Sequence, residues 1–172
     1  MPTILNLGAG SLNPLKKSEL INIDEFRGWN IVNLDIYNQV VKYSPDRSTI
    51  PHSDADIRYS DVERKIDFSD ETIDIVLAVS PYKYSVLNQE VYRVLKRSGV
   101  AVILGSQRNR YVTKIESLCS ADIKPHFFDL FEIMPANDLA LRCIQFVAER
   151  GSRNTSGENS TKLDFFGIYR KK

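Results

Sequence analysis

The sequence predicts an α/β domain whose sheet is mostly parallel and ends in a C-terminal antiparallel hairpin. In the middle of the chain, short runs that are apolar on both faces alternate with helical patterns, which is typical of parallel strands joined by crossover helices. The last two expected strands, Phe127–Met134 and Leu141–Ala148, are separated by a turn region around Pro135–Asp138. Because this turn is too short for a helical crossover, we expect the two strands to pair antiparallel.

Five earlier strands are predicted from β-branched or apolar runs bounded by polar residues or glycine. They are Thr3–Leu7, Asn30–Leu34, Asp56–Ser60, Ile73–Val79 and Val100–Leu104. The spacing of apolar residues over Val86–Lys96 predicts an amphipathic helix, and Gly99 is placed to cap its C-terminus. Tyr111–Ser120 is expected to form a further helix.

A length of 172 residues suits one domain. We expect this domain to span residues 1–150 and to be followed by a tail over residues 151–172. Gly151–Ser160 is rich in Gly, Ser and Asn, a composition typical of flexible segments. Within the tail, Leu163–Tyr169 is apolar enough to pack back as a short final element.

Composition and charge exclude several classes of protein. The net charge of +1 gives no overall basic footprint for nucleic acid or an anionic membrane. No apolar run approaches the ~18 residues of a membrane-spanning helix, and the N-terminus lacks the pattern of a signal peptide. Cys119 and Cys143 lie far apart, and His52 and His126 are isolated, so neither a disulfide framework nor a metal site is expected. These features predict a cytoplasmic protein.

A candidate ligand site follows the first strand. Gly8-Ala9-Gly10 places two glycines where a buried strand ends, which permits a sharp turn and lets a ligand approach main-chain N–H groups. Asp35 ends the second strand, 27 residues after Gly8, where a carboxylate can accept both hydroxyl hydrogen bonds of a ribose. The alternatives are a simple tight turn at the glycines and a helix N-cap at Asp35.

Several stretches resemble class I S-adenosylmethionine-dependent methyltransferases of the type 11 group. Leu5–Gly10 looks like their first motif, and Asn33–Ile36 looks like their second. Asp61–Val62, followed by Ile66–Val76, is similar to their acidic third region and the strand after it. Glu90–Gly99 resembles the helix and turn that lead into their fifth strand. The resemblance covers residues 3 to about 150 and implies a Rossmann-like sheet.

The resemblance implies S-adenosylmethionine as the cofactor. The residues that it assigns to cofactor binding are Asn6, Gly8, Ala9, Gly10, Asp35, Ile36, Asp61 and Val62. Asn6 stands where the family usually has an acid that orients the loop and the methionine amine. Ser11-Leu12-Asn13 replaces the common third glycine and Pro14 follows, so we expect a compact or reduced first helix.

Ser80-Pro81-Tyr82 follows the fourth strand and is similar to a tripeptide of amino-methyltransferases. The resemblance implies that its polar group and main-chain carbonyl hold the target amine while the aromatic ring stacks on a base. These three residues are therefore the catalytic candidates. The alternative is a proline-stiffened loop with Tyr82 and Tyr84 packed on the surface. Beyond the fifth strand, the basic residues form either a contact for an acidic substrate or a solvated face. They are Arg108, Arg110 and Lys114.

The expected function is methyl transfer from S-adenosylmethionine to a small molecule, which includes a nucleobase-like substrate, or to an exposed polar group. No general base is evident, which suits an in-line displacement on a nucleophile that needs little activation. One alternative is a non-catalytic relative that binds a nucleotide-like ligand or a protein partner. A nicotinamide-dependent oxidoreductase is a third interpretation, against which Glu90–Gly99 and the closing hairpin argue.

Overall fold

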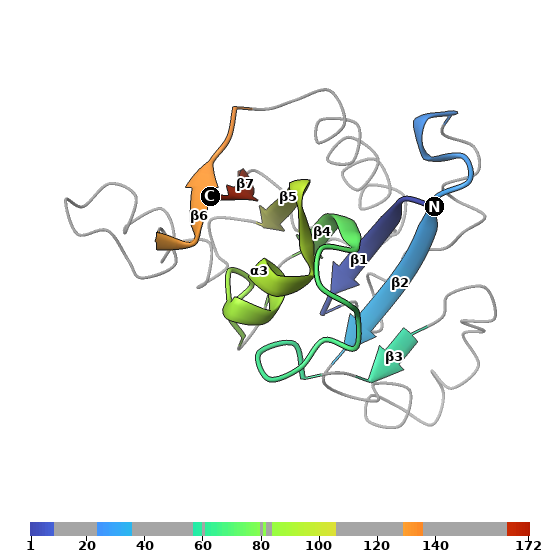
Figure 1. The fold of residues 1–172 in the computed structure, drawn as a ribbon, viewed down its shortest axis with the longest axis horizontal. Coiled ribbons are helices and arrows are strands. Elements are labelled where there is room, and N and C mark those ends of the chain that lie inside the picture. Colours follow the sequence, from blue (N-terminus) through green and yellow to red (C-terminus); the bar gives the residue numbers. More distant parts are fainter. Residues whose placement is uncertain are drawn as a thin grey trace, which may run out of the picture.

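The computed structural model describes residues 1–8, 24–35, 57–59, 61–79, 81, 84–105, 129–135 and 165–172 (Figure 1). Within these ranges the chain forms one seven-stranded sheet in the order β3-β2-β1-β4-β5-β7-β6. The strands are β1 (Thr3–Leu7), β2 (Asn30–Asp35), β3 (Ile57–Tyr59), β4 (Ile73–Val79), β5 (Leu95–Gly105), β6 (Phe131–Ile133) and β7 (Phe165–Lys171). The described helices are the 3-10 helix η1 (Asp24–Phe26) and the α-helix α3 (Gln89–Val94).

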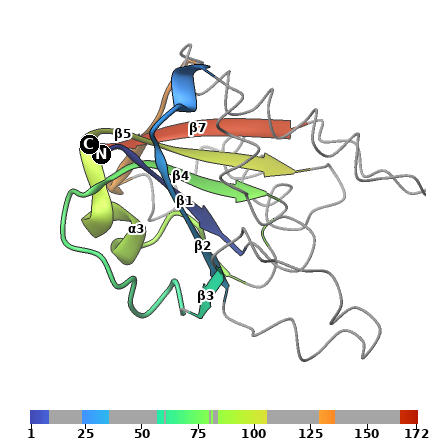
Figure 2. The same cartoon turned by 90° about the vertical axis from the view of Figure 1, so that its right-hand side faces the viewer.

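The sheet confirms the predicted fold class. Strands β1 to β5 pair in parallel, and β7 is antiparallel to both β5 and β6. Figure 2 shows β7 alongside β5. The first four predicted strands agree with the structure to within one residue at each end. The expected reduced first helix and the helix predicted over Tyr111–Ser120 lie outside the described residues.

The described antiparallel pairing at the C-terminal end of the sheet involves β7, and the predicted hairpin is not tested by the described residues. The described partner of β6 is β7, with Phe131 opposite Lys171, whereas the predicted partner, Leu141–Ala148, lies outside the described residues. Leu163–Tyr169, which is expected to pack back as a short final element, overlaps β7, and β7 lies between β5 and β6 as an inner strand of the sheet. Successive side chains Ile168 and Tyr169 are buried in the cores on its two opposite faces, which suits an inner position. The sheet therefore extends beyond the expected domain boundary at residue 150.

The helix predicted over Val86–Lys96 is much shorter in the structure. Its N-cap is Asn88, whose Oδ1 accepts a hydrogen bond from the Val91 amide at 2.9 Å. Its C-cap is Leu95, which already has extended backbone and is the first residue of β5. Leu95 is fully buried and pairs with Ile73 of β4, so this tertiary contact ends the helix before its helical pattern ends.

Gly99 lies inside β5, so its predicted role as a helix cap is wrong. Between Ile73 and Ile75 of β4, the register of the partner strand moves from Leu95 to Val100, which leaves a bulge in β5. A Cβ atom on Gly99 would lie 2.8 Å from the Asp74 carbonyl oxygen. The glycine therefore allows a close backbone approach between the two strands.

Both faces of the sheet are buried. One apolar cluster covers the face that packs against α3 and the segment 61–72, and it contains Leu5, Leu7, Ile66, Val76, Val91 and Val94 among others. The other cluster contains Ile4, Phe26, Ile31, Ile75, Leu77 and Val102 among others. Because β1 and β4 contribute to both clusters, their backbones are fixed from both sides, and the segments that follow them start from rigid positions.

Candidate functional site

Several of the predicted site residues that the structure describes lie at the carboxyl edge of the sheet. The chain passes from β1 to β2 and β3 on one side, and later to β4 and β5 on the other, so the strand order reverses at β1. In open α/β sheets, ligands bind beyond the carboxyl ends of the strands at such a switch point. Gly8 follows β1, Asp35 is the last residue of β2, and Pro81 follows β4 closely.

Asn6 lies inside the sheet and connects β1 to β2. Its side chain is buried, and its Nδ2 donates a hydrogen bond to Asn33 Oδ1 at 2.9 Å. The two residues are also register partners. A pair of neutral amides can be buried in this way without the cost of desolvating a charge. This contact accounts for an amide where the resemblance leads one to expect an acid.

The space beside Gly8 is filled by Tyr84. Gly8 has a φ of +63°, in the left-handed region that favours glycine. A Cβ atom on Gly8 would lie 2.9 Å from Cε1 and Cζ of the Tyr84 ring. The Tyr84 hydroxyl donates a hydrogen bond to the Leu7 carbonyl at 3.0 Å. The need for glycine at this position therefore comes from the turn and from a neighbouring side chain, both within the protein itself.

Asp61 and Val62 form a turn after β3. The Asp61 carboxylate accepts a hydrogen bond from the Glu63 amide at 3.2 Å and lies 3.4 Å from Arg64 Nε. The Asp61 side chain remains 32% exposed, so a ligand can still reach it. Val62 is buried in the core on the α3 side of the sheet and anchors the turn.

Two hydrogen bonds join this turn to the segment that follows β4. The Ser85 amide donates to Glu63 Oε1 at 2.7 Å. The Asn88 side chain donates to the Val62 carbonyl at 3.1 Å and to the Ser85 carbonyl at 2.8 Å. Together with the contact between Tyr84 and Leu7, these bonds connect the end of β1, the turn 61–64 and the segment 84–88. We call this arrangement the carboxyl-edge network.

The structure describes only some of the predicted site residues. Asn6, Gly8, Asp61, Val62 and Pro81 are described, and Pro81 is buried. For Asp35 the backbone alone is described. The predicted site residues outside the described part of the chain are Ala9, Gly10, Ile36, Ser80 and Tyr82, and the same holds for Arg108, Arg110, Lys114, His52, His126, Cys119 and Cys143.

Tyr84 was missed as a candidate site residue. From the sequence, Tyr84 is expected only to pack on the surface beside Tyr82. Its one signal was an aromatic residue a few positions after the end of a buried strand at the switch point. In the structure it is half-buried and lies against the end of β1.

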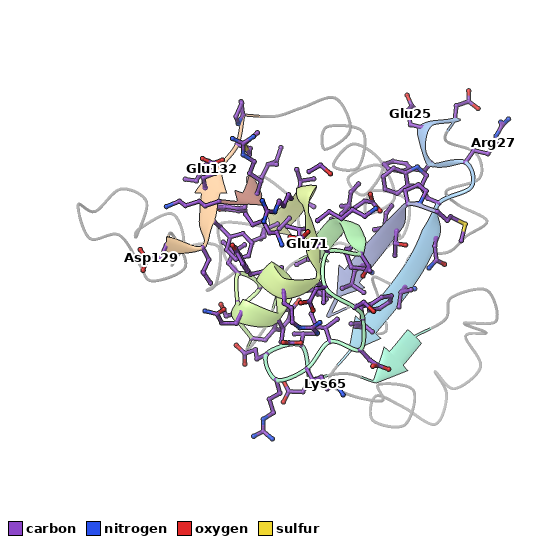
Figure 3. The ribbon with its side chains drawn as sticks, in the orientation of Figure 1. Glu25, Arg27, Lys65, Glu71, Asp129 and Glu132 are labelled. Carbon is purple, nitrogen blue, oxygen red and sulfur yellow. The ribbon has the colours of Figure 1, made fainter. Side chains whose placement is uncertain are left out.

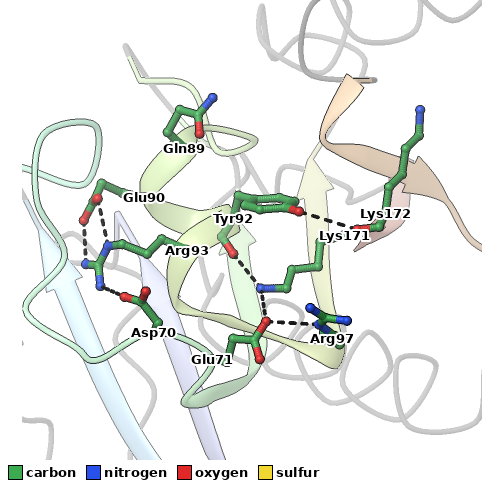
Figure 4. Close-up of a pocket in the computed structure, with 9 residues that line it drawn as sticks. All are labelled: Asp70, Glu71, Gln89, Glu90, Tyr92, Arg93, Arg97, Lys171 and Lys172. Atoms are coloured by element: carbon green, nitrogen blue, oxygen red, sulfur yellow. Dashed lines mark hydrogen bonds and ion pairs between the residues drawn. The ribbon is translucent and has the colours of Figure 1, made fainter.

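A second polar cluster fixes the segment 61–72 to α3. Arg93 donates hydrogen bonds of 2.8 Å to the carbonyls of Ile66 and Phe68, and also to the carboxylates of Glu90 and Asp70. Glu90 in turn accepts the Ile66 amide at 2.8 Å. The hydrogen bond from Arg93 holds the pKa of Glu90 below its ordinary value. Figure 4 shows Arg93 between Glu90 and Asp70.

A cavity of about 700 Å³ lies at the opposite, amino edge of the sheet, between α3, the start of β5 and the end of β7. Lys171 Nζ lies 2.9 Å from Glu71 Oε1 and donates to the Tyr92 carbonyl at 3.2 Å (Figure 4). Lys171 and, to a smaller degree, Arg97 lower the pKa of Glu71. These charged groups bind one another. Figure 3 places Glu25, Arg27 and Lys65 at the periphery of the molecule, away from this cluster.

The mostly parallel sheet and its reversal at β1 define a Rossmann-like α/β domain, and the polar network at its carboxyl edge marks a candidate switch-point site. The model of the methyltransferase domain family matches residues 5–103, more than half of the 172 residues. The chain belongs to this family. The expectation of an enzyme that uses S-adenosylmethionine is thereby confirmed at the level of the family.

Comparison with solved structures agrees on the fold. A 30S ribosomal A1408 methyltransferase from an uncultured bacterium superimposes with a TM-score of 0.54 and 17% identity, covering 99% of this chain and 88% of that one. A TehB-like SAM-dependent methyltransferase from Corynebacterium glutamicum superimposes with a TM-score of 0.52 and 14% identity. This match covers 99% of this chain and 80% of that one. A comparison with curated proteins gives no match. In the described part of the chain, no helix has the length and apolar character to cross a membrane.

Proposed function

We propose that this protein transfers the methyl group of S-adenosylmethionine to a small molecule, nucleobase-like substrates included, or to an exposed polar group. The observation that carries the proposal is the carboxyl-edge network, which joins the end of β1 and the turn 61–64, both expected to hold the cofactor, to the segment 84–88. This segment follows the loop expected to hold the acceptor. Membership of the methyltransferase domain family supports the reaction type. Two cysteines far apart in the sequence support the proposal of a cytoplasmic location.

The residues at the switch point fit such a cofactor. Gly8 turns the main chain at the end of β1 with a left-handed φ, and the Asp61 carboxylate stays partly exposed in the turn after β3. Asp35 ends the strand between these two segments in the sheet and is proposed to accept the ribose hydroxyls. Main-chain groups of Ala9, Gly10 and Ile36 complete the proposed set. When bound, S-adenosylmethionine supplies an electrophilic methyl group on its sulfonium.

Besides binding the cofactor, the protein has to align the acceptor with the methyl group and exclude water from the site. We assign the acceptor to the loop Ser80-Pro81-Tyr82, which directly follows β4. Pro81, the described residue of this loop, is buried. In this proposal the loop orients the nucleophile, and no side chain has to remove a proton before the methyl group moves.

Replacing Asp35 with alanine should weaken S-adenosylmethionine binding by about 1.5–3 kcal/mol, the scale of a hydrogen bond to a charged group. Calorimetric titration of the variant measures this loss. Asp24→Ala is the matched control, because Asp24 is an exposed acid of η1 that pairs with Arg27. If Asp35→Ala binds the cofactor as tightly as Asp24→Ala does, the ribose assignment is wrong.

Removing the Tyr82 ring should slow turnover and leave cofactor affinity unchanged. Stacking of a base on an aromatic ring contributes about 1–3 kcal/mol, so Tyr82→Ala should lower kcat/KM by roughly 5- to 150-fold for a flat substrate. Tyr82→Phe keeps the ring and should be mild. A lower melting temperature with normal specific activity of Tyr82→Ala would instead assign Tyr82 to packing, and the acceptor would then be sought near Arg108 and Arg110.

The proposed function as a whole is tested in two steps. Calorimetry should first show saturable binding of S-adenosylmethionine and S-adenosylhomocysteine. Incubation with a donor carrying a labelled methyl group should then transfer the label either to a pool of small metabolites or to RNA, and the labelled fraction identifies the acceptor class. Saturable binding without any turnover on either pool would favour the non-catalytic alternative. Absence of binding by both ligands would overturn the proposal.

A further inference from the structure

We propose that Tyr84 is a cofactor-binding residue, whose ring forms the wall of the S-adenosylmethionine site beside Gly8. This inference rests on the proposed function, because it assigns a role within the same site. Tyr84 lies outside the sequence motifs that resemble the family, and its side chain reaches the site from the segment after β4.

The position of the ring carries the first step. The Tyr84 ring lies on the side of Gly8 where a side chain would otherwise point, with two ring atoms 2.9 Å from the position of a Cβ. Leu7 ends β1, and its carbonyl accepts the Tyr84 hydroxyl at 3.0 Å. A ligand that lies against the main chain at the end of β1 therefore meets the Tyr84 ring on this side.

The second step is that the ring is held in place from two directions. Its hydroxyl is anchored on β1, and the next residue, Ser85, is anchored through its amide on Glu63 at 2.7 Å. Asn88 adds a further bond to the Val62 carbonyl. Part of the Tyr84 side chain also packs on the core cluster. Because the wall is already ordered, little conformational entropy is lost when a ligand binds to it.

The chemistry of a tyrosine wall matches this cofactor. A tyrosine ring presents an apolar face with a negative quadrupole, which suits an aliphatic chain and attracts a cation. S-adenosylmethionine combines these two features, since its thioether-derived chain carries a positive sulfonium. The hydroxyl at the ring edge is already used by Leu7, so the contact offered to the ligand is the ring itself.

Calorimetric titration with S-adenosylmethionine and S-adenosylhomocysteine tests the proposal on four variants of the full chain. Tyr84→Phe removes the anchor and keeps the ring, and Tyr84→Ala removes both. The matched controls are Tyr92→Phe and Tyr92→Ala. Tyr92 is also partly buried and also donates its hydroxyl to a main-chain carbonyl, that of Lys172 at 3.5 Å, but at the amino edge of the sheet. Thermal unfolding of each variant shows how much of its loss of binding comes from loss of folded protein.

The wild type should bind both ligands. We expect Tyr84→Phe to weaken binding by about 2- to 10-fold and Tyr84→Ala by about 10- to 100-fold. The Tyr92 variants should lower the melting temperature without changing the affinity of the folded protein. Unchanged affinity in Tyr84→Ala, or tighter binding because the ring obstructs the site, would overturn the proposal and leave the function standing. A wild type that binds neither ligand would overturn the function and, with it, this assignment.

Discussion

Arg93→Ala should destabilise the protein by about 2–4 kcal/mol, more than other single changes on the surface of α3. Arg93 is 31% exposed in its side chain and donates to two carbonyls and two carboxylates. Its removal leaves the carbonyl of the buried Ile66 without this donor and frees the segment 61–72 from α3. For a chain of this length, thermal unfolding should shift by roughly 4–16 °C.

Two variants serve as controls for this prediction. Arg97→Ala removes an arginine of the same region that is 88% exposed and whose ion pair with Glu71 has a distance of 3.4 Å. Its effect should stay within about 0.5 kcal/mol. Arg93→Lys keeps the charge but cannot reach several acceptors with a planar fork, so it should recover only part of the loss. Equal stability of Arg93→Ala and Arg97→Ala would contradict the assigned role.

The destabilisation caused by Arg93→Ala should depend on pH, because Arg93 binds the Glu90 carboxylate. Hydrogen bonding by Arg93 lowers the pKa of Glu90 from its ordinary value of 4.5, although burial acts in the opposite direction. Because its pKa is lower in the folded state, the Glu90 carboxylate stabilises the folded protein at pH values above 4.5. This stabilisation is lost as the pH falls through the folded-state pKa. Melting temperatures measured from neutral to acid pH should therefore fall less steeply for Arg93→Ala than for the wild type.

Most of the parallel half of the sheet could be predicted because its strands are apolar on both faces. Such runs, as in Ile73–Val79, are visible in the sequence and agree with β4. The errors lie where tertiary contacts override a local pattern. Leu95 continues the helical periodicity of α3 yet pairs with Ile73, and Gly99 resembles a helix cap yet fills a bulge. The strand Phe165–Lys171 follows a polar segment of the kind typical of flexible tails, so its position inside the sheet was not predicted.

The candidate site was predictable as a location and less so as a set of contacts. The glycines after β1 and the acid ending β2 mark the switch point, because parallel strands bring their carboxyl ends to one edge. Sequence alone could not show that Asn6 is engaged with Asn33 across the sheet. It also could not show that Tyr84 returns to Leu7, since that contact joins residues 77 positions apart.

The turn at Gly8 provides the second large expected effect. Gly8→Ala should cost about 1–2 kcal/mol for placing a side chain at a left-handed φ, and about 1–3 kcal/mol more for displacing the Tyr84 ring. Gly28→Ala separates these two contributions. Gly28 has a φ of +83°, and among the described residues no heavy atom lies within 4 Å of where its Cβ would stand. It therefore measures the cost of the backbone conformation alone.

A double-mutant cycle with Tyr84→Ala then assigns the steric contribution. If the Tyr84 ring is what Gly8 accommodates, Tyr84→Ala should reduce the cost of Gly8→Ala to about that of Gly28→Ala, a coupling of roughly 1–3 kcal/mol. Denaturant titration of the four proteins of the cycle, with Gly28→Ala beside them, measures this coupling. Additive effects would show that Gly8→Ala is accommodated without displacing the ring. In that case the close packing of Tyr84 on the end of β1 would not explain why a glycine stands there, and the approach of a ligand would become the better reason.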